Sequence, residues 1–275
     1  MTREDDPEDG GGFRIAAVGD IHVGTDSVGR LGRHLRDLDR HADVLLLAGD
    51  LSRGGRVEEA EVLAAELADV PVPIVAVLGN HDLHSGRAEE FRAVLVSCGV
   101  AVLEGENTVV DTPRGRVGVA GTIGFGGGFP GGACSDFGEA EMKAFVARAR
   151  EVAERLETGL RGLAGRATGV RVALTHYAPV RATLVGENPE IFPFLGSYLL
   201  AEVADRAGAD LYVHGHAHHG VEKGTTPHGI PVRNVAQPVI RRPFAVYRLH
   251  ANGGEAPPSR ASGRTGSAAA TSATR

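Results

Sequence analysis

The sequence predicts an α/β protein in which parallel strands alternate with helices and two sheets are formed. In the first third of the chain, short apolar runs alternate with amphipathic stretches. This rhythm is expected when strands are buried on both faces and helices connect them. Farther along, apolar residues alternate on either side of Pro113-Arg114-Gly115, a pattern typical of an antiparallel hairpin. The hairpin and the parallel strands together indicate two sheets.

Three strand–helix pairs are predicted first. The strands are the runs RIAAVGD (14–20), DVLLLAGD (43–50) and PIVAVLGN (73–80). Each is followed by a stretch with helical apolar periodicity, at about 27–40, 56–69 and 87–98. The order β-α-β-α-β implies parallel strands with helices on the faces of the sheet.

The second half of the chain adds strands and helices of both kinds. Residues 107–121 are predicted to form the hairpin, and a glycine-rich loop at 124–138 leads to a helix at about 139–157. Two more strands are expected at 170–177 and 210–216, with a helix near 197–207 between them. The segment GIPVRNVAQPVIRRPFAVYRL indicates two further antiparallel strands.

These elements indicate one domain over residues 13–250. Residues 1–12 are acidic, and residues 251–275 are rich in Ala, Ser, Gly and Pro. Both ends are therefore expected to be disordered arms. The 275-residue length suffices for one domain with a substantial core.

The amino-acid composition indicates which binding partners and which cellular compartment to expect for the protein. The formal net charge is −6 and no basic stripe is present, so bulk nucleic-acid binding is not expected. No apolar run reaches the roughly 20 residues that cross a bilayer, and the start lacks a secretory apolar region. The two cysteines form no CxxC pair, which fits a reducing compartment. We therefore expect a cytoplasmic protein that does not bind membranes, and the sequence leaves its oligomeric state open.

Polar residues follow five of the predicted strands at the point where each apolar run stops. In open α/β sheets, ligands bind beyond the carboxyl ends of the strands, so these side chains are expected to meet in one crevice. Asp20 and His22 are two residues apart, as are His216 and His218, and residues at this spacing face the same side of an extended backbone. The candidates are Asp20 and His22, Asp50, Asn80, His176, and His216 with His218.

The types of these residues indicate metal binding. Asp, Asn and His supply oxygen and nitrogen ligands to divalent metals, and no thiolate is among them. Seven ligands are too many for one tetrahedral zinc ion, which takes four. They suit two ions bridged by a carboxylate such as Asp50. The ligand types do not separate Mn, Fe, Zn and Mg.

The motifs occur in the order and approximate spacing of the calcineurin-like metallophosphoesterases, which the chain resembles over residues 14–220. They are Asp20-x-His22, Gly49-Asp50-x-x-x-Gly54, Gly79-Asn80-His81-Asp82, His176 and Gly215-His216-x-His218. Each motif alone is weak, and five in order are a strong signal. The resemblance implies two mixed β-sheets packed as a sandwich and flanked by helices, in four layers α-β-β-α.

The resemblance also implies a role for each site residue. Asp20, His22, Asp50 and His218 resemble the ligands of one metal; Asp50, Asn80, His176 and His216 resemble those of the second. Asn80 and His81 match substrate-binding positions, and His81 matches the histidine that protonates the leaving oxygen. Asp82 matches a position that orients His81. The implied reaction is in-line hydrolysis of a phosphoester by a hydroxide that bridges the two metals.

The form of the motifs favours one branch of this family. The segments GDL, GNHD, THYAP and GHAH resemble the bacterial phosphodiesterases, which include cyclic-nucleotide enzymes. A phosphodiester of nucleotide type, or another small phosphoester, is therefore the expected substrate. A phosphomonoesterase or a nuclease on the same site remains an alternative, and so does a non-catalytic scaffold of the same fold.

A few residues near the motifs are candidates for supporting roles. The glycine-rich segment 124–132 lacks the Gly-Lys-Ser/Thr ending of a P-loop and is expected to form a rim beside the site. His214 is a candidate for a supporting position, and His219 is expected to be peripheral. Three arginines are candidate partners of phosphate charge: Arg181, Arg241 and Arg242.

Overall fold

The computed structural model describes residues 11–251 and 254–255 and contains two six-stranded sheets. The first has the order β12-β11-β1-β2-β3-β4, and the second has the order β5-β6-β7-β8-β10-β9. Strands β1 to β4 are parallel, whereas β11 runs antiparallel to β1. In the second sheet, β6, β7, β8 and β10 are parallel, with antiparallel β5 and β9 at the edges.

The strands of the first sheet are β1 (Phe13–Val18), β2 (Val44–Ala48), β3 (Ile74–Val77), β4 (Ala101–Val102), β11 (Ala245–His250) and β12 (Gly254–Glu255). Those of the second are β5 (Asn107–Thr112), β6 (Gly115–Thr122), β7 (Val170–Thr175), β8 (Leu211–His214), β9 (Lys223–Thr225) and β10 (Pro231–Asn234). The helices are α1 (Gly32–Leu35), α2 (Val57–Leu67), α3 (Ala88–Ser97), α4 (Ala140–Arg161), α5 (Phe192–Leu195), α6 (Tyr198–Ala207) and α7 (Gln237–Ile240). Short 3₁₀ turns lie at Leu38–Arg40, Arg181–Leu184 and Pro189–Ile191.

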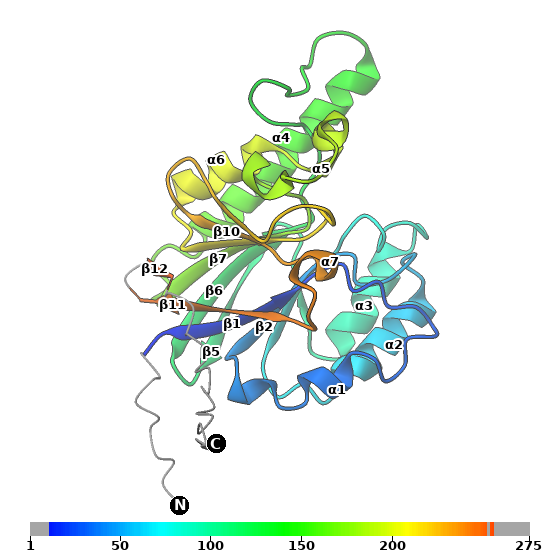
Figure 1. Ribbon diagram of the computed structural model, residues 1–275, viewed down its shortest axis with the longest axis vertical. Coiled ribbons are helices and arrows are strands. Elements are labelled where there is room, and N and C mark those ends of the chain that lie inside the picture. The colour runs from blue at the N-terminus through cyan, green and yellow to red at the C-terminus, as the bar shows by residue number, and fades with distance from the viewer. Residues whose placement is uncertain (1–10, 252–253, 256–275) are drawn as a thin grey trace, which may run out of the picture.

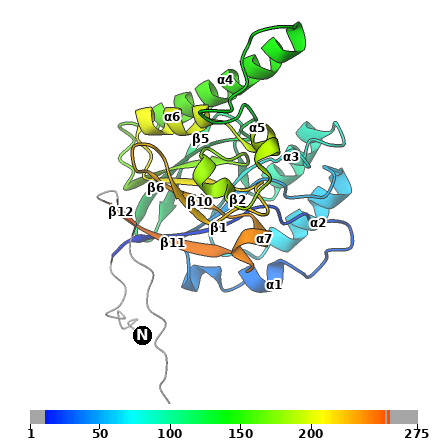
Figure 2. The ribbon, with the colours of Figure 1, turned by 45° about the horizontal axis from the view of Figure 1, so that its top comes forward.

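The two sheets pack face to face, with helices on both outer faces (Figure 1). Side chains of β7 point alternately to the two faces of its sheet, so both faces are buried. Val172 and Leu174 belong to the core shared with β1 to β3, whereas Ala173 belongs to the cluster beneath α4 and α6. Helices α2 and α3 cover the other outer face. The predicted four-layer sandwich is therefore confirmed. Figure 2 shows the first turns of α4 extending beyond the sheets.

One predicted helix needs correction, and two short strands were not predicted. The apolar periodicity predicts one helix over 27–40, but this stretch contains only the four-residue α1 and a 3₁₀ turn. The Glu66 carboxylate accepts hydrogen bonds from the backbone N–H groups of Gly29, Leu31 and Gly32, which holds the start of this segment in a loop. The sequence does not predict strands β4 and β9, because both are very short.

The end of the chain also differs from prediction. The expected antiparallel pair proves to be β10 and β11, which lie in different sheets with α7 between them. Strand β10 runs parallel to β8. The arms predicted at 1–12 and 251–275 lie mostly outside the described residues, but Gly254–Glu255 forms β12. No helix among the described residues is long and apolar enough to cross a membrane.

Candidate metal centre

The predicted ligands lie at the carboxyl ends of β1, β2, β3, β7 and β8, where the edges of both sheets meet. Contacts between the side chains join the two sheets there. His176, which directly follows β7, places Nδ1 2.9 Å from the carbonyl of Ala48 at the end of β2. His218 Nε2 lies 2.8 Å from Asp20 Oδ1, across the same boundary. The tertiary structure therefore brings residues from five strands into one site.

Three groups of possible ligand atoms form around this point. The groups are Asp20 with His22 and His218, His22 with Asp50 and His81, and Asp50 with His176 and His216; within each group the atoms lie within 4.8 Å of one another. Asn80 joins the last group, because its Oδ1 lies 3.0 Å from His176 Nε2. Asp50 thus takes part in groups on both sides of the site.

Two buried carboxylates supply the negative charge. Asp20 is 3 % exposed and Asp50 is 2 % exposed. Among the described residues, only histidines form ion pairs with them: His218 with Asp20, and His81 and His176 with Asp50. Buried carboxylates are normally paired or coordinate a metal, so this site is suited to cations.

The pKa values follow from burial and from these pairs. Burial opposes the charge on Asp50, but His176 and the backbone N–H of His81 outweigh it and lower the pKa of Asp50. Burial likewise opposes the charge on His176, yet the Asp50 carboxylate raises the pKa of His176 above its usual value. By contrast, burial lowers the pKa of His216 to about 3. His216 is therefore a neutral imidazole, the form that binds metals.

The hydrogen bonds around the histidines match those of metal-ligating imidazoles. A ligating histidine commonly donates its second ring N–H to a carbonyl or carboxylate, which orients the ring. His176 does this from Nδ1 to the Ala48 carbonyl, which turns Nε2 toward Asp50 and Asn80. His216 Nε2 lies 3.3 Å from the Phe194 carbonyl. The residues present fit two divalent cations that share Asp50.

Backbone strain is concentrated at the same positions. Six non-glycine residues of the described chain have positive φ, and four of them are predicted ligands: Asp20, His22, Asp50 and His216, with φ of 57°, 45°, 48° and 69°. Such a conformation costs on the order of 1 kcal/mol per residue and persists only where the surroundings impose it. Strain of this kind gathers at functional sites.

Two motif glycines are required because the carboxylates approach them closely. A Cβ at Gly215 would collide with Asp20 Oδ2, and one at Gly79 would collide with Asp50 Oδ1 and the Asp50 backbone nitrogen. The glycine of GNHD and that of GHAH therefore leave room for a ligand carried by a different motif. The linear sequence did not show this relation.

His81 and Asp82 occupy different environments. His81 has a 39 % exposed side chain, and its Nδ1 lies 2.9 Å from the Arg53 carbonyl. Since a carbonyl only accepts, this nitrogen carries a proton and Nε2 is turned toward Asp50, 3.8 Å away. Asp82 is fully buried and accepts hydrogen bonds from the backbone N–H groups of Leu51, Ser52 and Gly79 and from the Ser52 hydroxyl.

The expectation that Asp82 orients His81 therefore needs correction. The Arg53 carbonyl takes that place, and Asp82 instead joins the loop after β2 to the loop after β3. A backbone carbonyl leaves no trace in residue type, so the sequence carried no signal for this contact.

Other residues near the site were predicted with mixed success. The buried His214 ring contacts none of the predicted ligand side chains by hydrogen bonding among the described residues. Its Nε2 lies 2.9 Å from the Thr183 hydroxyl and its Nδ1 lies 2.7 Å from the Gly215 carbonyl. Tyr177 was missed, although it follows His176 directly; its ring centroid lies 4.4 Å from that of His216. The glycine-rich segment contacts α5 itself, where the Gly127 backbone N–H donates to the Pro193 carbonyl. Helix α5 also carries the Phe194 carbonyl that contacts His216.

Comparison with known proteins agrees with this geometry. The family model of the calcineurin-like phosphoesterases matches residues 13–220. Among curated proteins, none matches the chain significantly.

Solved structures show the same fold. Phosphopantetheinyl Hydrolase (PptH) from Mycobacterium tuberculosis has a TM-score of 0.62 at 17 % identity, covering 86 % of this chain and 96 % of that one. TT1561 of Thermus thermophilus has a TM-score of 0.51 at 16 % identity, over 87 % and 99 % of the two chains. A putative 5'-nucleotidase from Staphylococcus aureus has a TM-score of 0.51 at 15 % identity, over 81 % and 48 %. The match to the family model, which spans most of the chain, and the shared fold show that this chain belongs to the calcineurin-like phosphoesterase family.

Proposed function

We propose that the protein is a dinuclear metal-dependent hydrolase of phosphodiesters of nucleotide type. The observation that carries the proposal is Asp50, which belongs both to the donor group with His176 and His216 and to the group with His22 and His81. One metal would be held by Asp20, His22, Asp50 and His218, and the other by Asp50, Asn80, His176 and His216. When bound, two such ions lower the pKa of a coordinated water and withdraw charge from phosphoryl oxygens.

The protein's own residues contribute binding and proton transfer. The Asn80 side-chain amide and the His81 ring lie at the rim of the site, where they can donate hydrogen bonds to phosphoryl oxygens. The Arg53 carbonyl keeps a proton on Nδ1 of His81, so Nε2 is the nitrogen that exchanges a proton with substrate. His81 protonated on both nitrogens is the general acid for the leaving oxygen.

The form of the site and of its motifs supports a diester substrate. His81 and His218 are 39 % and 36 % exposed, so the centre opens to solvent on the side of the proposed acid. An open site of this kind admits a substrate with a group on each side of phosphorus. The THYAP and GHAH segments, which resemble the bacterial phosphodiesterase branch, favour the same assignment.

The test compares two aryl substrates on protein reconstituted with Mn²⁺. We expect bis(4-nitrophenyl) phosphate to be hydrolysed with a higher kcat/KM than 4-nitrophenyl phosphate, measured by release of nitrophenolate. A preference for the monoester would contradict the diesterase assignment and favour a phosphomonoesterase. If Mn²⁺, Fe²⁺, Zn²⁺ and Mg²⁺ all fail to support turnover of either compound, the protein is a non-catalytic member of the family.

A further inference from the structure

A cavity of about 410 Å³ opens directly beside the metal centre. Its lining includes His22, which also belongs to two of the donor groups described above. The cavity lies within the range of small-molecule sites. A ligand held by a phosphoryl group at the metal centre can therefore extend into this space without crossing protein.

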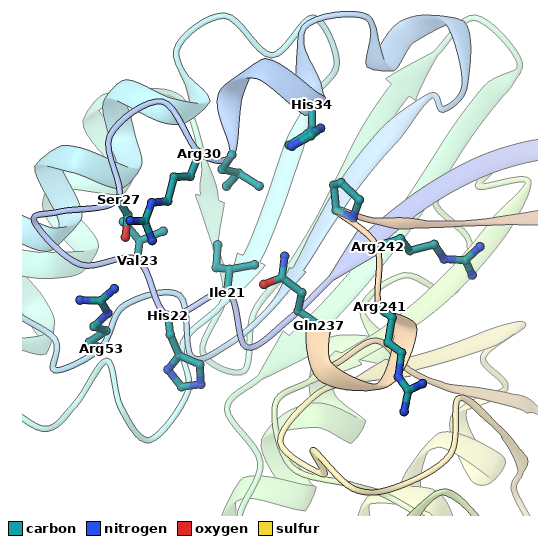
Figure 3. Close-up of a pocket in the computed structure, with 12 residues that line it drawn as sticks. Ile21, His22, Val23, Ser27, Arg30, His34, Arg53, Gln237, Arg241 and Arg242 are labelled. Atoms are coloured by element: carbon teal, nitrogen blue, oxygen red, sulfur yellow. The ribbon is translucent and has the colours of Figure 1, made fainter.

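The lining of this pocket is strongly basic. The described residues that form it include four arginines, Arg30, Arg53, Arg241 and Arg242, and no aspartate or glutamate. In Figure 3, His22, Arg53 and Arg30 lie along one side, Arg241 and Arg242 lie along the other, and Gln237 lies between them. The whole chain carries a net charge of −6, so this concentration of positive charge contrasts with its composition.

Two of the arginines form ion pairs with carboxylates, and Asp26, whose pKa is lowered mainly by its hydrogen bond with Arg53, also interacts with the charge of Arg30. Arg53 forms an ion pair with Asp26 at 2.8 Å, and Arg242 pairs with Glu222 at 3.3 Å. Among the described residues, no carboxylate lies within ion-pair distance of Arg30 or Arg241. The pocket therefore has an excess of two positive charges, one from each side.

The end of α7 fixes the position of Arg241 beside the pocket. Arg241 ends α7 with φ of 52°, and it is one of the two positive-φ non-glycine residues of the described chain that are not predicted ligands. The left-handed conformation costs an arginine on the order of 1 kcal/mol. This conformation ends the helix, because the Arg241 backbone N–H donates to the Gln237 carbonyl, as at many helix C-termini. The cap places Arg241, which forms no ion pair within the part of the chain that the structure describes, at the edge of the pocket.

We infer that this pocket binds a second phosphate group of the substrate, and that Arg30 and Arg241 are the residues that select it. Planar guanidinium groups bind phosphate through paired hydrogen bonds, and a dianionic phosphate matches two uncompensated charges. The apolar floor of Ile21, Val23 and Leu31 suits the organic group between the two phosphates. The inference rests on the proposed function, since it places the scissile phosphoryl group at the metal centre.

The test uses a ladder of alkanediol bisphosphates, from ethanediol to hexanediol, with the alkyl monophosphates of equal chain length as references. Because the ladder varies the distance between the phosphates, it does not depend on knowing the natural spacer. Affinity for the Mn²⁺-loaded protein is measured by isothermal titration calorimetry. At one spacer length, we expect the bisphosphate to bind at least about tenfold more tightly than its monophosphate, as one charge-assisted contact implies.

The variants are Arg30→Gln and Arg241→Gln, with Arg36→Gln as the matched control. Arg36 is an exposed arginine close in sequence to Arg30 and does not line the pocket. Each pocket variant should reduce the bisphosphate advantage at least about threefold, and the double variant should remove it, whereas Arg36→Gln should keep it. Thermal denaturation of each variant checks that it is folded.

Two results would overturn the inference. One is a bisphosphate advantage below about threefold at every spacer length in the unaltered protein; the other is an advantage that survives the double variant. Failure of the proposed function is seen separately, as absence of aryl diester turnover by the unaltered protein. Calorimetry reports on the pocket in either case.

Discussion

Asp50 is the residue that the two halves of the proposed metal centre share. Its oxygens lie 3.3 Å from His176 Nε2 and 3.8 Å from His81 Nε2, and one of them accepts a hydrogen bond from the His81 backbone. Its positive φ is a conformation that aspartate and asparagine tolerate better than most residues. Asparagine can therefore adopt the same backbone conformation at position 50, so Asp50→Asn removes the negative charge and keeps the shape of the side chain.

We predict that Asp50→Asn loses both metals, because it removes the negative charge common to the two ligand groups. The metal content after reconstitution and desalting is measured by mass spectrometry, and we expect well below one ion per chain. Asp39→Asn, at an exposed aspartate away from the site, should bind as much metal as the unaltered protein. Two ions retained at full occupancy in Asp50→Asn would show that Asp50 is not shared.

His81→Asn should keep the metals and lose rate. An asparagine at this position cannot donate a proton to the leaving oxygen, and general acid catalysis contributes about 10²–10⁴-fold. The measurement is kcat for the aryl diester together with metal content. The control is His84→Asn. His84 lies in the same loop, and its ring centroid is 5.7 Å from that of His81. Equal losses in the two variants would remove the assignment of His81 as the acid.

The segment between β1 and β2 shows how a distant side chain shapes the surroundings of the site. Buried Glu66, near the end of α2, accepts hydrogen bonds from three backbone N–H groups at residues 29–32. This holds the segment that carries Arg30 in a loop. Burial opposes the charge on Glu66, but the three backbone donors outweigh it and lower its pKa.

Glu66→Gln should reduce the free energy of unfolding by about 1–3 kcal/mol at pH 7, because charge-assisted hydrogen bonds are lost. Since the folded-state pKa is lowered, the charged form contributes stability above the unfolded value of about 4.5, and that contribution disappears as pH falls through the folded pKa. The difference between the unaltered protein and Glu66→Gln should therefore shrink from pH 7 to pH 3.5 in urea titrations.

The matched control for this effect is Glu61→Gln, an exposed position on α2. It should change the unfolding free energy by less than about 0.5 kcal/mol at either pH. A Glu66→Gln difference that stays constant over this pH range would show that the Glu66 charge does not hold the loop.

The proposed metal centre lies where the two sheets meet, and both sheets supply its predicted ligands. Asp20, His22, Asp50 and Asn80 follow strands of the first sheet, whereas His176, His216 and His218 follow strands of the second. Bound ions would therefore connect the two halves of the sandwich. A ligand that binds only the folded state stabilises it by mass action.

We predict that saturating Mn²⁺ raises the Tm by about 5–10 °C relative to protein treated with a chelator. The reason is that the ligand groups assemble only in the folded sandwich. Differential scanning calorimetry with and without metal measures the shift, and Asp50→Asn should show almost none. A shift of the same size in that variant would mean that the ions act at another place.

Much of this molecule could be predicted from its sequence. The apolar runs that became β1, β2, β3, β7 and β8, and the polar residues that follow them, are local patterns, because a buried strand and its polar end are both encoded by neighbouring residues. The seven metal-site residues could be proposed from the same patterns. The short α1 and the parallel β10 could not, because Glu66 and the pairing with β8 decide them from far along the chain.

Only the tertiary structure decided how the site is built in detail. The sequence determined which residue types stand at the strand ends, since each motif is a few consecutive letters. Three details depend on segments that are distant in sequence: the Arg53 carbonyl faces His81, Asp82 joins two loops, and Gly215 makes room for Asp20. The arginines of the pocket are likewise separated by up to about 200 residues and meet only because α7 folds back beside the loop after β1. Close approach of remote backbone is a property of packing, and no local pattern records it.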